Sequence, residues 1–263
     1  MNVVQLVWVG FTFEGRFPKD EIQLPDDIIQ YPNYWCFWIG CLRCNLNCQY
    51  CYNKKFLDQD IIQFDSSFIS DIRQQFPIDT FVYGVGEPGL FTNEIAKIIQ
   101  QYPSDQFRHC IKTNGSFISD DLAEDIYAIN TDIKGNSAFY DQITQRIGFF
   151  EDVLKPHLHW LSEIAIPDKE LTYSIWLWRN DDEETRQLVL KYVDQTDARL
   201  CLNFIRSHKN FDVGYDLSLD NERVYERICD IYLWFKDYGI EPFMFNFKDF
   251  DPNKTSQEFN QES

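Results

Sequence analysis

The chain has 263 residues, of which 44% are hydrophobic and 25% are charged. This composition excludes a largely disordered protein, and the length exceeds that of small domains that need disulfides for stability. Its 42 Asp and Glu residues against 24 Lys and Arg give a formal net charge of −18, which disfavours nucleic acid as a primary partner.

The first ten residues and the cysteines bear on the compartment. The sequence begins without a cationic segment and cleavage site, and no apolar run approaches the roughly 18 residues of a membrane span. Five of the eight cysteines lie between Cys36 and Cys51, whereas disulfide-rich domains spread their cysteines along the chain. We therefore expect a cytoplasmic protein, no membrane association, and a metal site at these cysteines.

Three regions are expected in chain order. Residues 1–33 form an N-terminal extension with a strand over residues 3–11, because apolar residues alternate there. Residues 34–248 form the main domain. Residues 249–263 are polar with few apolar side chains, which predicts a disordered tail.

Within the main domain, runs rich in β-branched and aromatic residues alternate with segments of helical period. The predicted strands are 34–40, 79–84, 107–112, 129–134, 172–178 and 198–205. The predicted helices are 66–76, 92–102, 119–128, 151–163, 182–195 and 221–238. This order predicts an α/β fold, a partial (β/α)6 TIM-like barrel with parallel strands and its chemistry at their carboxyl ends.

A cysteine-rich loop, IGCLRCNLNCQYCYN at residues 39–53, follows the first of these strands and contains Cys44, Cys48 and Cys51. Thiolates are the usual ligands of iron–sulfur clusters, and three of them on a four-iron cluster leave one iron open for a small molecule. Structural zinc takes four ligands, and Cys41 could supply the fourth. The spacing leaves both metals possible and favours the open iron–sulfur site.

This spacing, with Tyr50 directly before the last cysteine, resembles the signature of the radical S-adenosylmethionine superfamily. The resemblance implies that Cys44, Cys48 and Cys51 hold a [4Fe–4S] cluster whose open iron binds S-adenosylmethionine. It also implies reductive cleavage of that cofactor to a 5′-deoxyadenosyl radical, which abstracts hydrogen from a substrate. The electron would come from a reductant such as a flavodoxin or ferredoxin.

Later motifs extend the resemblance. The segment Gly84-Val-Gly-Glu-Pro88 resembles the family's Gly-Gly-Glu-Pro loop, although Val85 stands where the first Gly is usual. Thr-Asn-Gly at 113–115 and Asp-Ile-Lys at 132–134 resemble elements of the activating enzymes of glycyl radical enzymes, with Lys112 where those often have Asp. The resemblance implies cofactor contacts for Tyr50, Gly84, Gly86, Glu87, Thr113, Asn114, Asp132 and Lys134.

We therefore expect a single-cluster radical S-adenosylmethionine enzyme, and the last two motifs favour activation of a glycyl radical enzyme. One alternative is a member of the same superfamily that modifies a small metabolite or a peptide. Another is a structural zinc- or iron-binding module that uses Cys41 with the three loop cysteines. Residues 178–183 resemble the family's Asn-Asp-x-Glu segment, and Arg206 and His208 are candidates for substrate contact. The sequence identifies no catalytic residue and leaves open whether the substrate is a small molecule or a protein.

Overall fold

The computed structural model describes residues 5–11, 35–41, 43–49, 51, 73, 79–116, 120–176, 181–205 and 221–244. The chain divides into two compact units. The first comprises residues 1–47, 51–131 and 163–169, and the second comprises residues 48–50, 132–162 and 170–263. The region boundaries expected after residues 33 and 248 lie outside the described residues and stay predictions.

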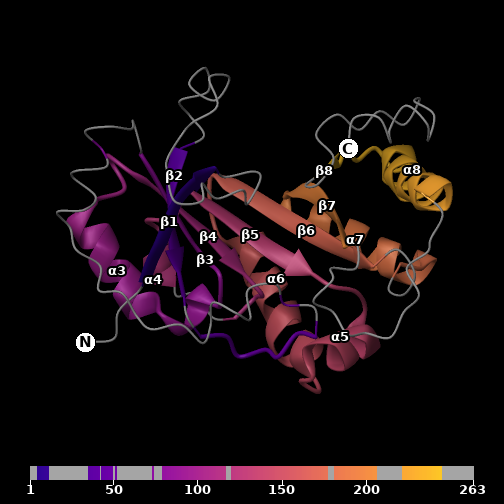
Figure 1. Ribbon diagram of the computed structural model, residues 1–263, viewed down its shortest axis with the longest axis horizontal. Coiled ribbons are helices and arrows are strands. Elements are labelled where there is room, and N and C mark those ends of the chain that lie inside the picture. The colour runs from indigo at the N-terminus through magenta and orange to yellow at the C-terminus, as the bar shows by residue number, and fades with distance from the viewer. Residues whose placement is uncertain are drawn as a thin grey trace. The chain divides into compact units, whose positions relative to one another are not determined.

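The first unit is built on strands β1 to β5, which Figure 1 shows beside α3. Their bounds are β1 Gln5–Phe11, β2 Trp35–Gly40, β3 Thr80–Gly84, β4 Arg108–Thr113 and β5 Ala128–Ile133. The strand β1 pairs with β2 in antiparallel fashion, whereas β2, β3, β4 and β5 pair successively in parallel. In this register Gly40 lies opposite Gly84, so the loops that follow β2 and β3 start side by side.

The core of the first unit is centred on β3. All five residues of β3 are buried, as expected for a parallel strand that is covered on both faces. The ring of Phe81 stacks on Phe37 and on His109. Helix α3 (Thr92–Gln101) buries three isoleucines at helical spacing, namely Ile95, Ile98 and Ile99. Its short companions are η3 (Pro88–Leu90) and α4 (Asp120–Ala123).

The second unit contains β6 (Asp168–Trp176) from Glu170 onward, β7 (Arg199–Ile205) and β8 (Phe243–Met244). Both pairs, β6 with β7 and β7 with β8, are parallel. Among its described residues this unit contains five helical segments: α5 (Ser137–Thr144), the π-helix η4 (Phe150–Leu154), α6 (Lys155–Glu163) up to Ser162, α7 (Glu183–Thr196) and α8 (Asn221–Asp237).

The predicted fold class is confirmed: the chain is α/β, with mostly parallel strands in an open sheet, consistent with a partial TIM-like barrel. The N-terminal strand is present as β1. The sequence did not predict α5, which begins after Asn136, whose side chain accepts a hydrogen bond from the Phe139 amide. The helix expected at 66–76 lies outside the described residues except for Arg73.

Pro156 marks a change of helix type. The Lys155 amide bonds back to the Phe150 carbonyl, five residues earlier, which closes η4 before α6 begins. Because Pro156 has no amide hydrogen, it suits the first turn of α6 and could not continue a regular ladder. The single helix predicted over 151–163 is therefore two helical segments.

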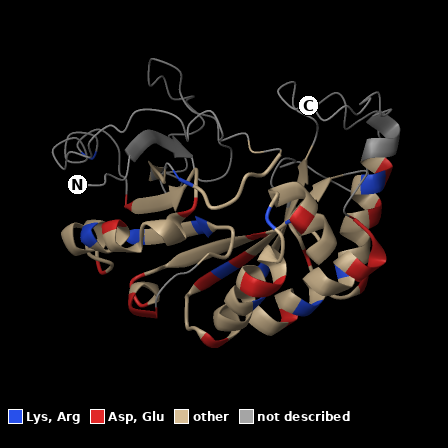
Figure 2. Cartoon of the chain, turned by 90° about the horizontal axis from the view of Figure 1, so that it is seen from below, with Lys and Arg blue, Asp and Glu red and all other residues tan. Residues whose placement is uncertain are grey.

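Charges of both signs are interspersed along the described helices (Figure 2). None of the described helices is both long enough and apolar enough to cross a membrane.

Candidate functional site

The Glu87 side chain is the centre of the site in the first unit. It is fully buried, and its carboxylate accepts hydrogen bonds from three donors. The Thr113 hydroxyl and the Gly89 amide donate to Oε1, at 2.6 Å and 3.0 Å, and the Asn114 amide donates to Oε2 at 2.8 Å. One carboxylate therefore fixes the loops that follow β3 and β4.

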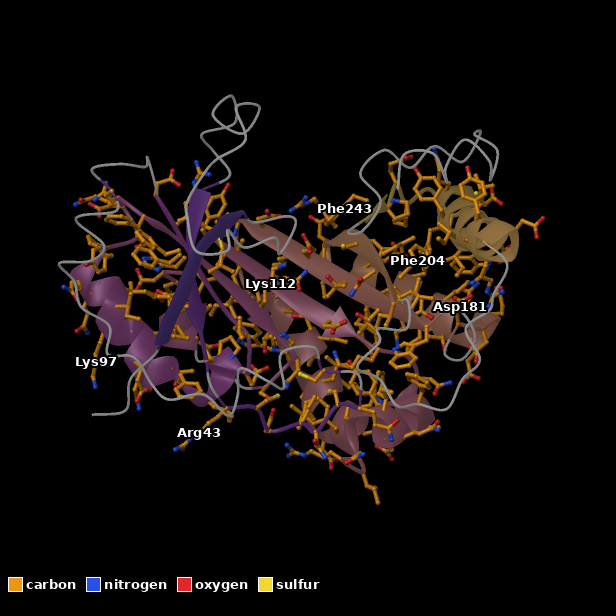
Figure 3. All side chains as sticks on the ribbon, in the orientation of Figure 1. Arg43, Lys97, Lys112, Asp181, Phe204 and Phe243 are labelled. Atoms are coloured by element: carbon orange, nitrogen blue, oxygen red, sulfur yellow. The ribbon has the colours of Figure 1, made fainter. Side chains whose placement is uncertain are left out.

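The main chain of the same residue reaches the cysteine loop. The Glu87 amide donates to the Arg43 carbonyl at 2.8 Å, and the Cys41 amide donates to the Gly84 carbonyl at 2.7 Å. The Arg43 side chain, by contrast, is exposed and points away from the ribbon (Figure 3). Two main-chain hydrogen bonds thus join the Gly-Val-Gly-Glu-Pro loop to the cysteine loop.

Gly86 is required by this close approach. A Cβ atom built on it would lie 1.6 Å from the Cys41 carbonyl oxygen and 2.6 Å from that of Arg43. Both are backbone atoms, which cannot move aside as a side chain can. Gly86, the second glycine of the motif, therefore has a packing role between the two loops.

Val85 occupies a conformation that favours glycine. Its φ is +65°, in the left-handed region, where a β-branched residue is a genuine outlier. Val85 is also nearly buried. Val85 therefore has a backbone conformation that suits glycine, and because it carries a branched side chain that conformation is strained.

The Thr-Asn-Gly segment forms a tight turn at the carboxyl end of β4. The Gly115 amide donates to the Thr113 hydroxyl at 3.0 Å, and Gly115 has a φ of +96°. The Asn114 amide nitrogen Nδ2 lies 3.8 Å from Cys44 Sγ and 2.9 Å from Asn45 Oδ1. This turn thus contacts the first of the three cysteines.

The donor set of the cysteine loop fits an iron–sulfur cluster. All eight cysteines of the chain are thiols. Those at Cys44, Cys48 and Cys51 are partly exposed, and the Leu46 amide donates to Cys44 Sγ at 3.5 Å. Amide donors to thiolate sulfur are a usual feature of such clusters. Among the described residues, no three His, Cys, Asp or Glu side chains form a ready-made metal site, so these ligands stay a prediction.

Cys41 differs from Cys44, Cys48 and Cys51 in its environment. It is fully buried, and burial raises the pKa of its thiol well above the ordinary 9.0, with further contributions from the Glu87 and Glu94 carboxylates. Burial likewise raises the pKa of Cys110 to about 12.

Cys48 belongs to the second unit and lies against an apolar cluster of Phe139, Ile143 and Trp176. The neighbouring Gln49 amide donates to the Ile143 carbonyl at 3.0 Å. Helix α5, which the sequence did not predict, therefore anchors this part of the cysteine loop.

Asp132 and Lys134 form an ion pair at the carboxyl end of β5. The Lys134 side chain is 6% exposed and that of Asp132 is 29% exposed. The Ser174 hydroxyl donates to Asp132 Oδ1 at 2.6 Å and accepts from Asn203 Nδ2 at 3.3 Å. The Tyr140 hydroxyl also donates to the Asp132 carbonyl at 2.7 Å. The result is a partly open carboxylate held by its neighbours.

The Asn-Asp-x-Glu segment has a structural role in its described part. Asp181 is almost fully buried and makes ion pairs with Arg186 and Arg227, both at 2.8 Å. Asp182 caps α7 by accepting from the Thr185 amide at 2.7 Å. Arg186 also contacts Asp230 at 2.7 Å, so these ion pairs join α7 to α8.

The predicted site residues thus divide between the two units. The first unit brings together Cys44, Gly84, Gly86, Glu87, Thr113 and Asn114. In the second unit Asp132 pairs with Lys134. Tyr50, residues 178–180, Arg206 and His208 lie outside the described residues.

The sequence also left some neighbours of these residues unidentified. In the first unit Asn45 and Ser116 complete the contacts of Asn114, and in the second Ser174, Asn203 and Tyr140 complete those of Asp132. Ser116 directly follows the Thr-Asn-Gly motif and Asn45 lies inside the cysteine motif, which are the only sequence signals for them.

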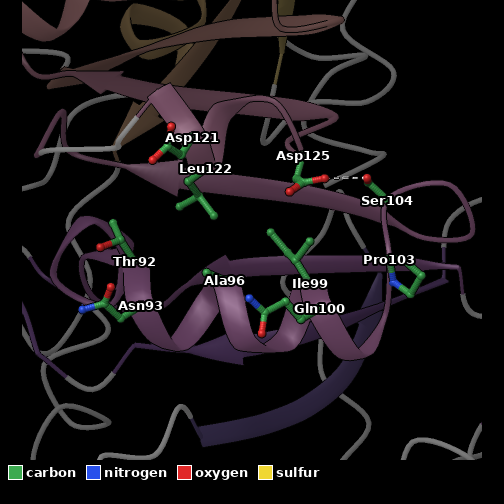
Figure 4. Close-up of a pocket in the computed structure, with 10 residues that line it drawn as sticks. All are labelled: Thr92, Asn93, Ala96, Ile99, Gln100, Pro103, Ser104, Asp121, Leu122 and Asp125. Atoms are coloured by element: carbon green, nitrogen blue, oxygen red, sulfur yellow. Dashed lines mark hydrogen bonds between the residues drawn. The ribbon is translucent and has the colours of Figure 1, made fainter.

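One pocket of the first unit lies between α3 and α4 (Figure 4). Ten residues line it, including Ala96, Ile99, Gln100 and Leu122. None of the predicted site residues lines it.

Comparison with known proteins agrees with this arrangement at the level of the fold. No family model matches the chain. A stretch of 93 residues is 35% identical to an uncharacterized protein of Methanocaldococcus jannaschii, covering 32% of this chain and 31% of that protein. The chain thus aligns with about a third of that relative's length.

Many solved structures share the fold, among them the following two. One is TYW1 with a lysine–pyruvate adduct bound, at a TM-score of 0.54 and 12% identity over 77% of this chain and 73% of that one. The other is Streptococcus suis SuiB bound to S-adenosylmethionine, at a TM-score of 0.59 and 9% identity. That match covers 83% of this chain and 52% of the SuiB chain. At these identities the similarity shows a common fold.

Proposed function

We propose that the chain is a radical S-adenosylmethionine enzyme in which Cys44, Cys48 and Cys51 hold a [4Fe–4S] cluster. The observation that carries this proposal is the position of Glu87, whose side chain is buried. Three motifs that the sequence suggested separately, the cysteine loop, the Gly-Val-Gly-Glu-Pro loop and the Thr-Asn-Gly turn, are joined through this one residue. A structural zinc module would not require the last two motifs.

The cluster, with S-adenosylmethionine on its open iron, would supply reductive cleavage of the sulfonium and hydrogen abstraction from the substrate. The residues of the chain supply the placement. Glu87 holds the loops after β3 and β4, and Gly86 allows the first of these loops to reach the cysteine loop. Asn114 and the Leu46 amide donate to Cys44 Sγ. We assign Asp132, which is partly exposed beside Lys134, to contact with the cofactor.

The decisive experiment is anaerobic reconstitution with iron and sulfide, followed by S-adenosylmethionine and a strong reductant. The wild-type chain should form 5′-deoxyadenosine, and replacement of Cys44, Cys48 or Cys51 by Ala should abolish it. Cys41→Ala is the matched control and should retain both iron and activity, because the proposed cluster takes three cysteine ligands and leaves its fourth iron open. A colourless protein that keeps stoichiometric zinc and forms no 5′-deoxyadenosine would refute the proposal.

For the substrate, we propose a glycyl radical enzyme. The Thr-Asn-Gly and Asp-Ile-Lys elements support this, because they resemble those of the activating enzymes. Incubation of the reconstituted chain with candidate glycyl radical proteins should give a protein-based radical signal in electron paramagnetic resonance.

A peptide substrate is the second candidate. The SuiB fold also matches this chain in the complex of SuiB with its precursor peptide SuiA, at a TM-score of 0.57 and 11% identity. Turnover of a peptide or metabolite, without a protein radical on any glycyl radical candidate, would favour this alternative over the activase.

A further inference from the structure

Asn114, Asn45 and Ser116 form a closed ring of side-chain hydrogen bonds beside Cys44. Asn114 Nδ2 donates to Asn45 Oδ1 at 2.9 Å, and Asn45 Nδ2 donates to Ser116 Oγ at 2.6 Å. Ser116 Oγ in turn donates to Asn114 Oδ1 at 2.7 Å. The three residues come from two loops of the first unit, since Asn45 and Ser116 are 71 positions apart.

The ring fixes which way the Asn114 amide faces. Its oxygen accepts from both the hydroxyl and the main-chain amide of Ser116, the latter at 3.1 Å. Its nitrogen has two hydrogens, one directed at Asn45 Oδ1 and one at Cys44 Sγ, 3.8 Å away. A flipped amide would set its oxygen against two acceptors and its nitrogen against two donors. The N–H group therefore points at the sulfur.

We propose that Asn114, oriented by Asn45 and Ser116, is a positioning residue that raises the reduction potential of the cluster held by Cys44. This inference rests on the proposed function. An N–H donor stabilises negative charge on a ligating sulfur, and the reduced cluster carries one more negative charge than the oxidised one. The hydrogen bond therefore favours the reduced form.

The test is a reductive titration of the reconstituted cluster, followed by electron paramagnetic resonance, in Asn114→Leu. This variant is neutral, removes the donor and leaves the main-chain bond to Glu87. At a fixed applied potential near the midpoint, the ratio of reduced to oxidised cluster should fall about tenfold, a shift of ~59 mV for a one-electron couple. In deuterium oxide, electron–nuclear double resonance should lose the exchangeable-deuteron coupling that comes from Asn114, while the coupling from the Leu46 amide remains.

Two further variants make the result decisive. Ser116→Ala removes one of the two donors to Asn114 Oδ1 and should shift the potential in the same direction by a smaller amount, which covers the case in which Asn114→Leu does not fold. Gln100→Leu is the control. It removes an exposed amide near the carboxyl end of α3 and should leave the potential unchanged.

The outcomes separate the two proposals. A wild-type chain that assembles no cluster would overturn the proposed function and this inference together. A wild-type chain that assembles the cluster and forms 5′-deoxyadenosine, with the same potential in Asn114→Leu, Ser116→Ala and Gln100→Leu, would overturn the inference and leave the function standing.

Discussion

The Thr113 hydroxyl donates a hydrogen bond of 2.6 Å to the buried carboxylate of Glu87, 26 residues earlier in the chain. The adjacent Asn114 amide donates to the other oxygen of the same carboxylate. All of these groups are buried, so a neutral side chain in place of the Glu87 carboxylate leaves a buried donor without an acceptor. A change at Glu87 should therefore alter both the site and the stability of the first unit.

Glu87→Gln should lower the free energy of unfolding by about 2–3 kcal/mol, because one Gln atom becomes a donor that faces donors. S-adenosylmethionine binding should weaken with it. Urea denaturation, with the cofactor affinity measured in parallel, checks both. Glu124→Gln is the control, since that side chain is exposed and the change should stay within about 0.5 kcal/mol. Equal effects of the two substitutions would contradict the role assigned to Glu87.

Gly86→Ala should destabilise the chain by about 3 kcal/mol or more, because the new methyl group overlaps the carbonyl of Cys41. The displaced loop should also lower the iron bound after reconstitution. Gly239→Ala is the matched control: a Cβ there meets nothing within 4 Å, and only the φ of +82° makes it unfavourable. That strain costs about 1–2 kcal/mol. A Gly86→Ala protein as stable as Gly239→Ala would show that the two loops do not pack as closely as described.

The buried His157 predicts a loss of stability in mild acid. Burial lowers its pKa from 6.5 to about 4, so folding favours the neutral ring. The free energy of unfolding is therefore unaffected by this group above the unfolded-state pKa of about 6.5. It falls as the pH drops from about 6.5 towards 4, by about 3 kcal/mol at most. His157→Gln cannot titrate and should flatten the profile of unfolding free energy between pH 7.5 and 5. Parallel profiles for wild type and variant would exclude this contribution.

The sequence predicts those features of the fold that depend on neighbouring residues better than those that depend on contacts between distant residues. The strands β2 to β7 were predictable because each contains a short run rich in β-branched or aromatic residues, which is a local signal. Helix α5 was missed although Asn136 provides an N-cap, since its eight residues are few for a periodic pattern. The π-helix before Pro156 depends on which carbonyl the Lys155 amide reaches, and the sequence does not encode that choice locally.

The same limit applies to the site. Motif spacing identified Glu87 and Asn114, but not that their groups bind each other, because they are 27 residues apart. Neither Asn45 nor Ser116 was assigned to a ligand from the sequence. Their role depends on the contact between two loops that are distant in the sequence. Val85 was recognised as a departure from the family pattern. Only the structure shows that its φ lies in the left-handed region that favours glycine.

Val85 provides a test in which two opposing effects can be separated. At an ordinary strand position such as Val82, which is buried in β3, Gly should be less stable than Ala by about 0.5–1 kcal/mol. At Val85 both substitutions lose buried side-chain surface, but only Gly removes the left-handed strain of about 1–2 kcal/mol. Val85→Gly should therefore be at least as stable as Val85→Ala, the reverse of the order at Val82. Urea denaturation of the four variants decides it, and the same order at both positions would mean that the φ of Val85 is not strained.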